Sequence, residues 1–277
     1  IIEINMKRTI YLPLLFLLLF CCKSAFSQNE NLRNSEKPII PFMNYLHIKE
    51  GFSALSSLAF INHSFVSLSA ENRFLLKEMM TKEITSAFIF KGNVFKISTS
   101  HFGYSKFGEL TTRLGYAKLF GNRFSTAVQF YHIFEHAFQY ENEHSFSFDI
   151  SFSLKINQKT YITVLILNPV KIRRGLSKQS PILPMLLRAN IAYLMNKNLL
   201  FYSSVEKEMN SCLRGELGVG YQFLKQAAFA VVLYLPSSEI SAIFRLSFTK
   251  INLEIANSYN FKTGFSPSLS LIIPFIL

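Results

Sequence analysis

Residues 145–154 alternate between apolar and polar side chains without interruption. Because successive side chains of an extended chain point to opposite faces, this segment predicts a β-strand with one apolar and one polar face. Similar segments recur along the chain, which favours a sheet closed into a barrel, with its apolar face toward lipid and its polar face inside. The apolar positions are Phe146, Phe148, Ile150, Phe152 and Leu154, and the polar ones are Ser145, Ser147, Asp149, Ser151 and Ser153.

The alternating segments predict about fourteen strands, with twelve as the alternative. An even number of strands is typical of single-chain bacterial barrels. We therefore expect an all-β fold, a closed antiparallel transmembrane β-barrel with a short N-terminal plug or hatch segment. The expected strands are 65–70, 83–91, 94–103, 109–119, 124–133, 144–155, 160–167, 186–194, 198–207, 213–223, 227–234, 240–248, 251–258 and 266–277.

Three hairpin turns can be tested by asking whether apolar residues on the two strands share a face. All three pass, although one of them needs a wider turn or a bulge. The predicted turns are 92–93 with Phe90 opposite Phe95, 249–250 with Leu246 opposite Leu253, and a three-residue loop at 121–123 with Phe120 opposite Phe124.

The N-terminus has the order of a secretory signal peptide. Lys7 and Arg8 precede an apolar run of 13 residues over 10–22, and the small residues Ala25 and Ser27 fit cleavage after Ser27. The run is short for a membrane-spanning helix, which needs about 20 residues. We expect 1–27 to be the signal peptide, with residues 1–5 ahead of the true start at Met6. We expect 28–64 to be a plug or periplasmic leader and 65–277 to be the outer-membrane barrel.

The charge of the chain is strongly positive. The formal net charge is +12, and removal of 1–27 takes away three basic residues and one acidic one and leaves +10. An exported chain rarely meets nucleic acid, so we expect no nucleic-acid partner and favour outer-membrane lipid and the phosphates of lipopolysaccharide. Two of the three cysteines, Cys21 and Cys22, leave with the signal, so we expect Cys212 to remain alone.

One segment, 132–136, matches the H-x-x-E-H pattern of certain zinc proteases, in which a helix places two histidines on one face. The preceding residues alternate as a strand, which would separate His132 and His136 by roughly 13 Å at about 3.3 Å per residue. The other four histidines show no ligand spacing, and no Ser, His and Asp set stands out. We therefore expect no metal site, no cofactor, no catalytic residue and no enzyme activity.

Charged residues within the expected strands indicate which face is the lumen. Arg113 and Glu254 alternate out of phase with apolar neighbours, and Asp149, the single aspartate of the chain, lies among serines. An Arg or Lys on the lipid face costs about 2–4 kcal/mol at the midplane, so charges should point inward. The candidate lumen-facing residues are Arg113, Ser147, Asp149, Ser151 and Glu254.

Two further segments depart from regular strands. The longest break, 168–184, is rich in proline and basic residues, which predicts a basic, solvent-exposed loop. Near the C-terminus, Pro274 lies inside the last expected strand and Phe275 comes two places before the final residue. Because proline is tolerated only at strand edges or bulges, we expect a weak closing seam.

The order of several short motifs resembles the PorV/PorQ-like barrels, which are relatives of the long-chain fatty acid transporter FadL. This resemblance implies a fourteen-stranded outer-membrane barrel with an N-terminal hatch, but it carries over no ligand-binding residues. The motifs are ENRFLLKE at 71–78, HFGYSKFGE at 101–109, LGYAK at 114–118, LNP at 167–169, VEK at 205–207, GVGY at 218–221 and LPSS at 235–238.

Two functions are consistent with this pattern. The first is a FadL-like barrel that passes or binds small hydrophobic or amphipathic molecules. The second is a non-transporting accessory barrel that docks a subunit of a secretion system, of the type IX kind, or of another outer-membrane assembly. An empty lumen packed shut by side chains would count against the first, and isolation as a lone monomer would count against the second.

Overall fold

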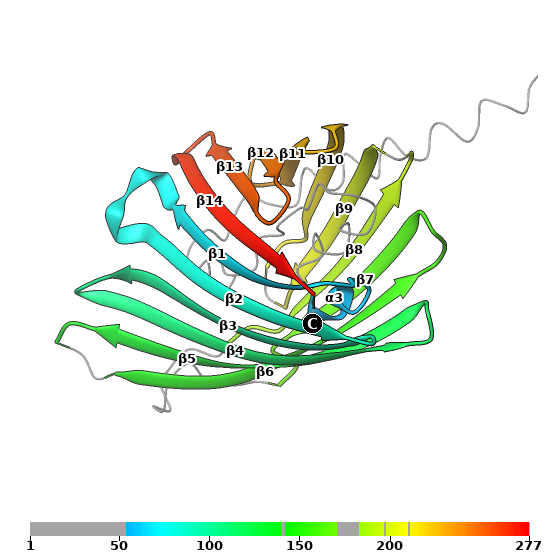
Figure 1. Cartoon of the computed structure of the whole chain (residues 1–277). Coiled ribbons are helices and arrows are strands. Elements are labelled where there is room, and N and C mark those ends of the chain that lie inside the picture. The colour runs from blue at the N-terminus through cyan, green and yellow to red at the C-terminus, as the bar shows by residue number, and fades with distance from the viewer. Residues whose placement is uncertain (1–53, 140–141, 171–182, 197, 210, 277) are drawn as a thin grey trace, which may run out of the picture.

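The computed structural model describes residues 54–139, 142–170, 183–196, 198–209 and 211–276. Within these residues, fourteen antiparallel strands form one closed barrel in which consecutive strands are neighbours and β14 meets β1 (Figure 1). The strands are β1 (Ser64–Asn72), β2 (Met80–Phe90), β3 (Asn93–Tyr104), β4 (Phe107–Phe120), β5 (Phe124–Ala137), β6 (Glu143–Lys155), β7 (Thr160–Leu167), β8 (Leu186–Leu194), β9 (Leu199–Glu208), β10 (Arg214–Leu224), β11 (Ala227–Leu235), β12 (Glu239–Ser247), β13 (Asn252–Asn260) and β14 (Gly264–Phe275).

The fold class expected from the sequence is confirmed, and the alternative of twelve strands is wrong. The short helical segments among the described residues are α3 (Leu55–Leu58), η2 (Arg73–Leu75) and η3 (Lys77–Met79). None of the described helices is both long and apolar enough to cross a membrane. The predictions for residues 1–27, and for most of the segment 28–64, concern residues outside those that the structure describes.

The distribution of apolar and polar side chains over the two faces of the barrel is the reverse of that in a soluble protein. In β6, Phe146 is 66% exposed on the outer face while Ser147 is 6% exposed on the inner face. Large apolar side chains are exposed in the same way on all the other strands except β7, and the buried side chains include many Ser, Thr, Arg and Glu. The two-residue period of the sequence therefore places apolar surface where a lipid bilayer would cover it.

The two ends of the barrel differ in their connections. At the end where β1 starts and β14 stops, the links between strands are two to four residues long, and we name it the short-turn end. At the opposite, long-connection end, η2 and η3 join β1 to β2, and residues 168–185 join β7 to β8. In bacterial barrels the short turns face the periplasm and the longer loops face the exterior.

Two of the three predicted hairpin registers are confirmed. Leu246 pairs with Leu253, as the turn at 249–250 requires. Phe120 pairs with Phe124 around the three-residue loop at 121–123. Face matching thus located both turns correctly.

The register of the first hairpin was predicted wrongly. The turn consists of Lys91 and Gly92, so that Phe88 rather than Phe90 lies opposite Phe95. Lys91 and Gly92 have φ of 47° and 77°, which is the positive φ that a two-residue type I′ turn needs at both positions. The error moves each partner by two residues, which leaves every side chain on its predicted face, so face matching could not detect it.

The closing seam joins β1 to β14 over eight residue pairs, as many as join β1 to β2. Pro274 lies opposite Phe65 near the end of the strand, and the ring of Phe275 packs edge-on against Phe88 at 6.1 Å between centroids. Proline at this terminal position interrupts little of the ladder. A weak seam therefore has no support in the number of paired residues.

Residues 54–61 lie inside the short-turn end of the barrel. Leu55, Leu58 and Ile61 are at most 7% exposed and share an apolar cluster with inner-wall residues such as Val94 and Ala117. In Figure 1, α3 appears beside the C-terminal end of β14, in agreement with the presence of Ile272 in the same cluster. We name residues 54–61 the inner plug.

The structure corrects two expectations, one about the segment 168–184 and one about Cys212. The segment 168–184 was expected to be exposed, but Asn168 and Leu183 are 5% and 2% exposed, so its two ends turn into the barrel. Its middle, 171–182, lies outside the described residues. Cys212, expected to be alone, is disulfide-bonded. That expectation assumed loss of residues 1–27, which contain the other two cysteines of the sequence, and their removal would leave Cys212 without an intramolecular disulfide.

Candidate functional site

The candidate site is the lumen, whose wall is built from the inward-facing positions of the fourteen strands. The structure places all five predicted candidates there: Arg113, Ser147, Asp149, Ser151 and Glu254 are each at most 6% exposed and occupy the inner face. Their contribution to binding any ligand stays a prediction. Their contacts divide the lumen into a plug site, a set of charged pairs and a hydroxyl and amide network.

The inner plug is held by serines of β5 and β6. The backbone N–H of Ser56 donates to Ser151 Oγ at 3.2 Å, and Ser56 Oγ lies 2.7 Å from Ser153 Oγ. From β5, Ser125 Oγ donates to the carbonyl oxygen of Ser56 at 2.6 Å. The polar half of the alternating β6 pattern therefore anchors the plug, because short hydroxyl side chains satisfy the backbone groups of a helix with a single turn.

Gly115 leaves the space that the plug fills. A Cβ atom at Gly115 would lie 2.3 Å from Cδ2 of Leu55, closer than any real contact. Leu55 is 3% exposed and Leu58 is 7% exposed, so the plug cannot move aside without losing buried apolar contact. Gly115 thus sets how deeply the plug enters the wall of β4.

On the far wall, Glu206 of β9 lies between two arginines on the neighbouring strands. Arg188 Nε donates to Glu206 Oε2 at 3.0 Å, and Nη2 donates to the same oxygen at 2.5 Å. Arg214 Nη1 is 3.9 Å from the other oxygen, Oε1. Nearby, the Tyr202 hydroxyl donates to Glu216 at 2.8 Å. These cross-strand contacts join β8, β9 and β10 with paired charges on the lumen side.

Glu254 has a cross-strand partner that the sequence analysis missed. Arg245 of β12 pairs directly with Glu254 of β13, and its Nε donates to Glu254 Oε2 at 2.9 Å. A second bond joins Nη2 of Arg245 to the same oxygen. Arg245 is fully buried, with 0% of its surface exposed. The predicted turn at 249–250 already placed these two residues opposite each other, so the register would have revealed the pair.

Arg113 makes looser contacts than Arg245. Its Nη1 lies 3.4 Å from Ser100 Oγ and 3.9 Å from Glu83 Oε1. The side chain of Glu83 is 21% exposed and also accepts a hydrogen bond from Thr85 at 3.1 Å. This pair is therefore longer and more hydrated than the pair of Arg245 and Glu254.

A hydroxyl and amide network links β5, β6 and the connection after β7. Gln129 Nε2 donates to Asp149 at 3.2 Å. Asn168 Oδ1 accepts from Ser147 Oγ at 2.5 Å and also from the hydroxyl of Tyr131. Asn168 Nδ2 donates to the carbonyl oxygen of Pro184 at 3.1 Å, which ties the two ends of the connection together. Asn168 belongs to the LNP motif at 167–169, but sequence patterning did not predict these contacts, because they depend on how a long segment folds back.

The lumen also has an apolar strip on the wall formed by β9, β11 and β12. Tyr202, Ala228, Ala230, Val232 and Ile243 form one buried cluster, at most 6% exposed, with Tyr234 and Ala256 packed against it. This strip lies beside the charged pairs of Glu206. Because these side chains are almost fully covered, the strip is packed apolar interior beside paired charges.

The segment 132–136 lies wholly within β5, so its strand context is confirmed. His132 and His136 occupy outward positions, and His132 Nε2 lies 3.0 Å from Nδ1 of His144 on β6. Their rings are stacked at 5.2 Å between centroids. Among the residues that the structure describes, no group of three His, Cys, Asp or Glu side chains could hold a metal ion.

Comparison with known proteins finds a likeness of fold alone. No family model matches the chain, and no curated protein matches it either. The CymD monoaromatic hydrocarbon channel superposes with a TM-score of 0.64 at 9% identity, covering 86% of this chain and 99% of that chain. The Pseudomonas putida toluene transporter TodX gives 0.56 at 6% identity, covering 80% and 92%. A FadL homologue of Pseudomonas aeruginosa gives 0.52 at 9% identity, covering 80% and 91%.

These matches place the chain in a structural class. It has the membrane β-barrel fold of FadL-type hydrophobic channels. The particular resemblance to PorV/PorQ-like barrels is not supported by these matches and stays a prediction.

Proposed function

We propose that this protein is an outer-membrane channel that passes small hydrophobic or amphipathic molecules. The observation that carries the proposal is the likeness of the whole barrel to the CymD monoaromatic hydrocarbon channel, over 86% of this chain. Monoaromatic hydrocarbons are therefore the first compounds to test. Such molecules dissolve poorly in a layer of phosphorylated sugar, so a protein path with apolar surface would help them to cross.

The interior supports a selective path rather than an open water-filled pore. The inner plug lies within the short-turn end, where an open porin would have free passage. The wall around Val232 is apolar and the Arg188 and Glu206 pair lies beside it, and both are buried, so a molecule would reach them only as side chains move aside. A molecule with an apolar body and a weakly polar end would match both surfaces.

Export of the chain is part of the proposal. Residues 1–27 would direct secretion and be removed after Ser27, which leaves the mature barrel in the bacterial outer membrane. N-terminal sequencing of protein purified from an outer-membrane fraction tests this, with a new terminus at Gln28 as the expected result. Retention of Lys7 and Arg8 in the purified chain would contradict it.

The function is tested by uptake. Cells that lack their own hydrocarbon channels and express the full chain should take up radiolabelled toluene faster than empty cells, while uptake of a sugar of similar mass should not change. The matched control is a variant of the same barrel with the outward residue Phe229 changed to Leu, which leaves the lumen intact. Equal stimulation of sugar and toluene would point to an open porin, and no stimulation of toluene would refute the proposal.

A specific observation favours the second candidate, a non-transporting accessory barrel of a type IX-like secretion system or another assembly. Several inner-wall arginines pair with glutamates of neighbouring strands, as Arg188 does with Glu206 and the fully buried Arg245 with Glu254. Charged side chains of the inner wall that pair with one another need no ligand to balance their charge. This candidate predicts stable co-purification with a larger outer-membrane complex in mild detergent and no stimulation of toluene uptake. Toluene uptake by a lone, monodisperse barrel would decide for the channel.

A further inference from the structure

Charges on the outer face of the barrel are of one sign. Among the described strand residues, carboxylates occupy inward positions and none is more than partly exposed, whereas the basic side chains at outward positions are lysines and histidines. They comprise Lys82, Lys118, Lys207 and the histidines of β3, β5 and β6. An outer face that carries bases without acids attracts an anionic neighbour.

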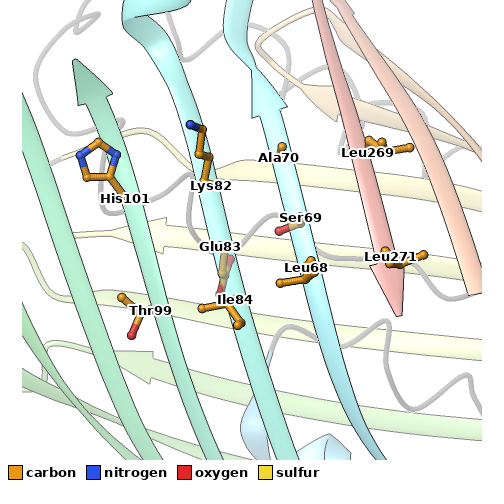
Figure 2. Close-up of a pocket in the computed structure, with 10 residues that line it drawn as sticks. All are labelled: Leu68, Ser69, Ala70, Lys82, Glu83, Ile84, Thr99, His101, Leu269 and Leu271. Atoms are coloured by element: carbon orange, nitrogen blue, oxygen red, sulfur yellow. The ribbon is translucent and has the colours of Figure 1, made fainter. Parts of the chain in front are cut away.

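Two of these bases border a groove on the same face. The groove crosses β14, β1, β2 and β3 and has a volume of about 520 Å³. Figure 2 shows its side chains: the small side chain of Ala70 lies between Leu269 and Lys82, and Leu68 and Ile84 lie side by side further along the strands. Leu68, Ile84 and Leu269 are each between 46% and 51% exposed. The groove is thus a mainly apolar trough in the wall where an acyl chain could lie, although its lining also includes Ser69 and Glu83, whose strand positions face inward.

Lys82 and His101 lie at one end of this trough. Lys82 pairs directly with His101 across β2 and β3, and Ala70 pairs with Lys82 across β1 and β2. Side chains of directly paired residues lie about 5 Å apart at Cβ, so Lys82 and His101 can contact one group together. Lys82 is the third residue of β2, which begins at the long-connection end. The basic pair therefore faces the outer leaflet of the membrane.

We propose that this groove binds lipopolysaccharide, with an acyl chain in the apolar trough and a lipid A phosphate on Lys82 and His101. Phosphate oxygens accept charge-assisted hydrogen bonds from a lysine ammonium and hydrogen bonds from an imidazole N–H. The position of the pair at the external end selects the outer-leaflet lipid over an inner-leaflet phospholipid. The proposal rests on the outer-membrane placement in the proposed function, but it does not depend on what passes through the lumen.

The first test measures binding of purified diphosphoryl lipid A to the full barrel in neutral-lipid nanodiscs. The double variant Lys82→Ala with His101→Ala should bind about tenfold more weakly, the order expected for losing two partly solvated phosphate contacts. Lys118→Ala is the matched control, because Lys118 is also outward and exposed but lies near the short-turn end. It should bind as tightly as the unmodified chain.

The second test fills the trough without changing charge. Ala70→Phe should weaken lipid A binding several-fold, while Ala242→Phe, on the outer face of β12 away from the groove, should have no effect. Equal binding by the Lys82 and His101 variant and the unmodified chain would overturn the proposal. Equal affinity for phosphatidylglycerol and for lipid A would overturn the choice of lipid.

The same variants separate this proposal from the proposed channel. Toluene uptake by the Lys82 and His101 double variant should equal that of the unmodified chain, because both side chains lie outside the lumen. Loss of lipid A binding with normal uptake supports the groove. Unchanged lipid A binding refutes the groove, whatever the uptake assay shows.

Discussion

Glu254→Ala is expected to destabilise the barrel strongly, because it removes the carboxylate that faces a fully buried guanidinium. Arg245 is 0% exposed and the side chain of Glu254 is 6% exposed, so little water reaches the pair. Removal of one partner from a buried ion pair typically costs about 3–5 kcal/mol of the free energy of unfolding. Replacing both residues, as in Arg245→Met with Glu254→Leu, should recover most of that loss, since no buried charge remains.

The pair of Arg113 and Glu83 provides a comparison within the same barrel. Its nitrogen and oxygen are 3.9 Å apart and the side chain of Glu83 is 21% exposed, so water screens the interaction. We expect Glu83→Ala to cost only about 1 kcal/mol. The ratio between the two single variants therefore measures how much burial and close geometry strengthen a charged pair in this lumen.

The measurement is equilibrium unfolding by urea in lipid vesicles. The chain has no tryptophan, so far-UV circular dichroism and the mobility of the folded barrel on gels are suitable readouts. Equal losses for Glu254→Ala and Glu83→Ala would refute the reasoning. So would a double variant as unstable as Glu254→Ala alone, because the penalty would then not arise from the stranded guanidinium.

Three further predictions concern the lipid face, the plug and the amide network. Phe148→Arg should reduce insertion into vesicles, since an Arg near the midplane costs about 2–4 kcal/mol, while Phe148→Leu should insert normally. Gly115→Ala should lower the free energy of unfolding by about 1–3 kcal/mol by overpacking against Leu55, and adding Leu55→Ala should relieve the overlap that causes this cost. Asn168→Ala should cost about 1–3 kcal/mol, because buried hydroxyl groups lose their acceptor, measured by urea titration.

Each of these predictions has an outcome that contradicts it. Efficient insertion of Phe148→Arg would mean that this face does not meet lipid. A loss in the Gly115→Ala with Leu55→Ala variant equal to the sum of the two single losses would remove the steric explanation. Asn168→Ala as stable as the unmodified chain would mean that water replaces the amide in the network.

The strands could be predicted because side chains in a barrel wall alternate between the two faces, and the polarity of each residue indicates which face it occupies. The segment 186–194 alternates so regularly that its predicted bounds are those of β8. Register was harder, since the alternative turn at 92–93 preserves all the faces that the one at Lys91 and Gly92 produces. Backbone φ at Lys91 decides between them, and apolar patterning does not report that angle.

The contents of the lumen could be predicted only in part. Inward orientation of Glu254 follows from its phase within one strand, and its partner Arg245 follows from one hairpin register. The contacts of Asn168 and of the inner plug join segments far apart in the sequence. No local pattern encodes them, because they exist only once the wall has curved round on itself.

The seam between β1 and β14 unites residue 64 with residue 275, a span of nearly the whole described chain. Bringing such distant segments together costs chain entropy that local hairpins avoid, so this step is intrinsically slow. The inner plug precedes β1 directly and lies within the cylinder. It must therefore already be in place, or be carried inward, at the moment the first and last strands meet, which makes its capture a late and decisive event in assembly.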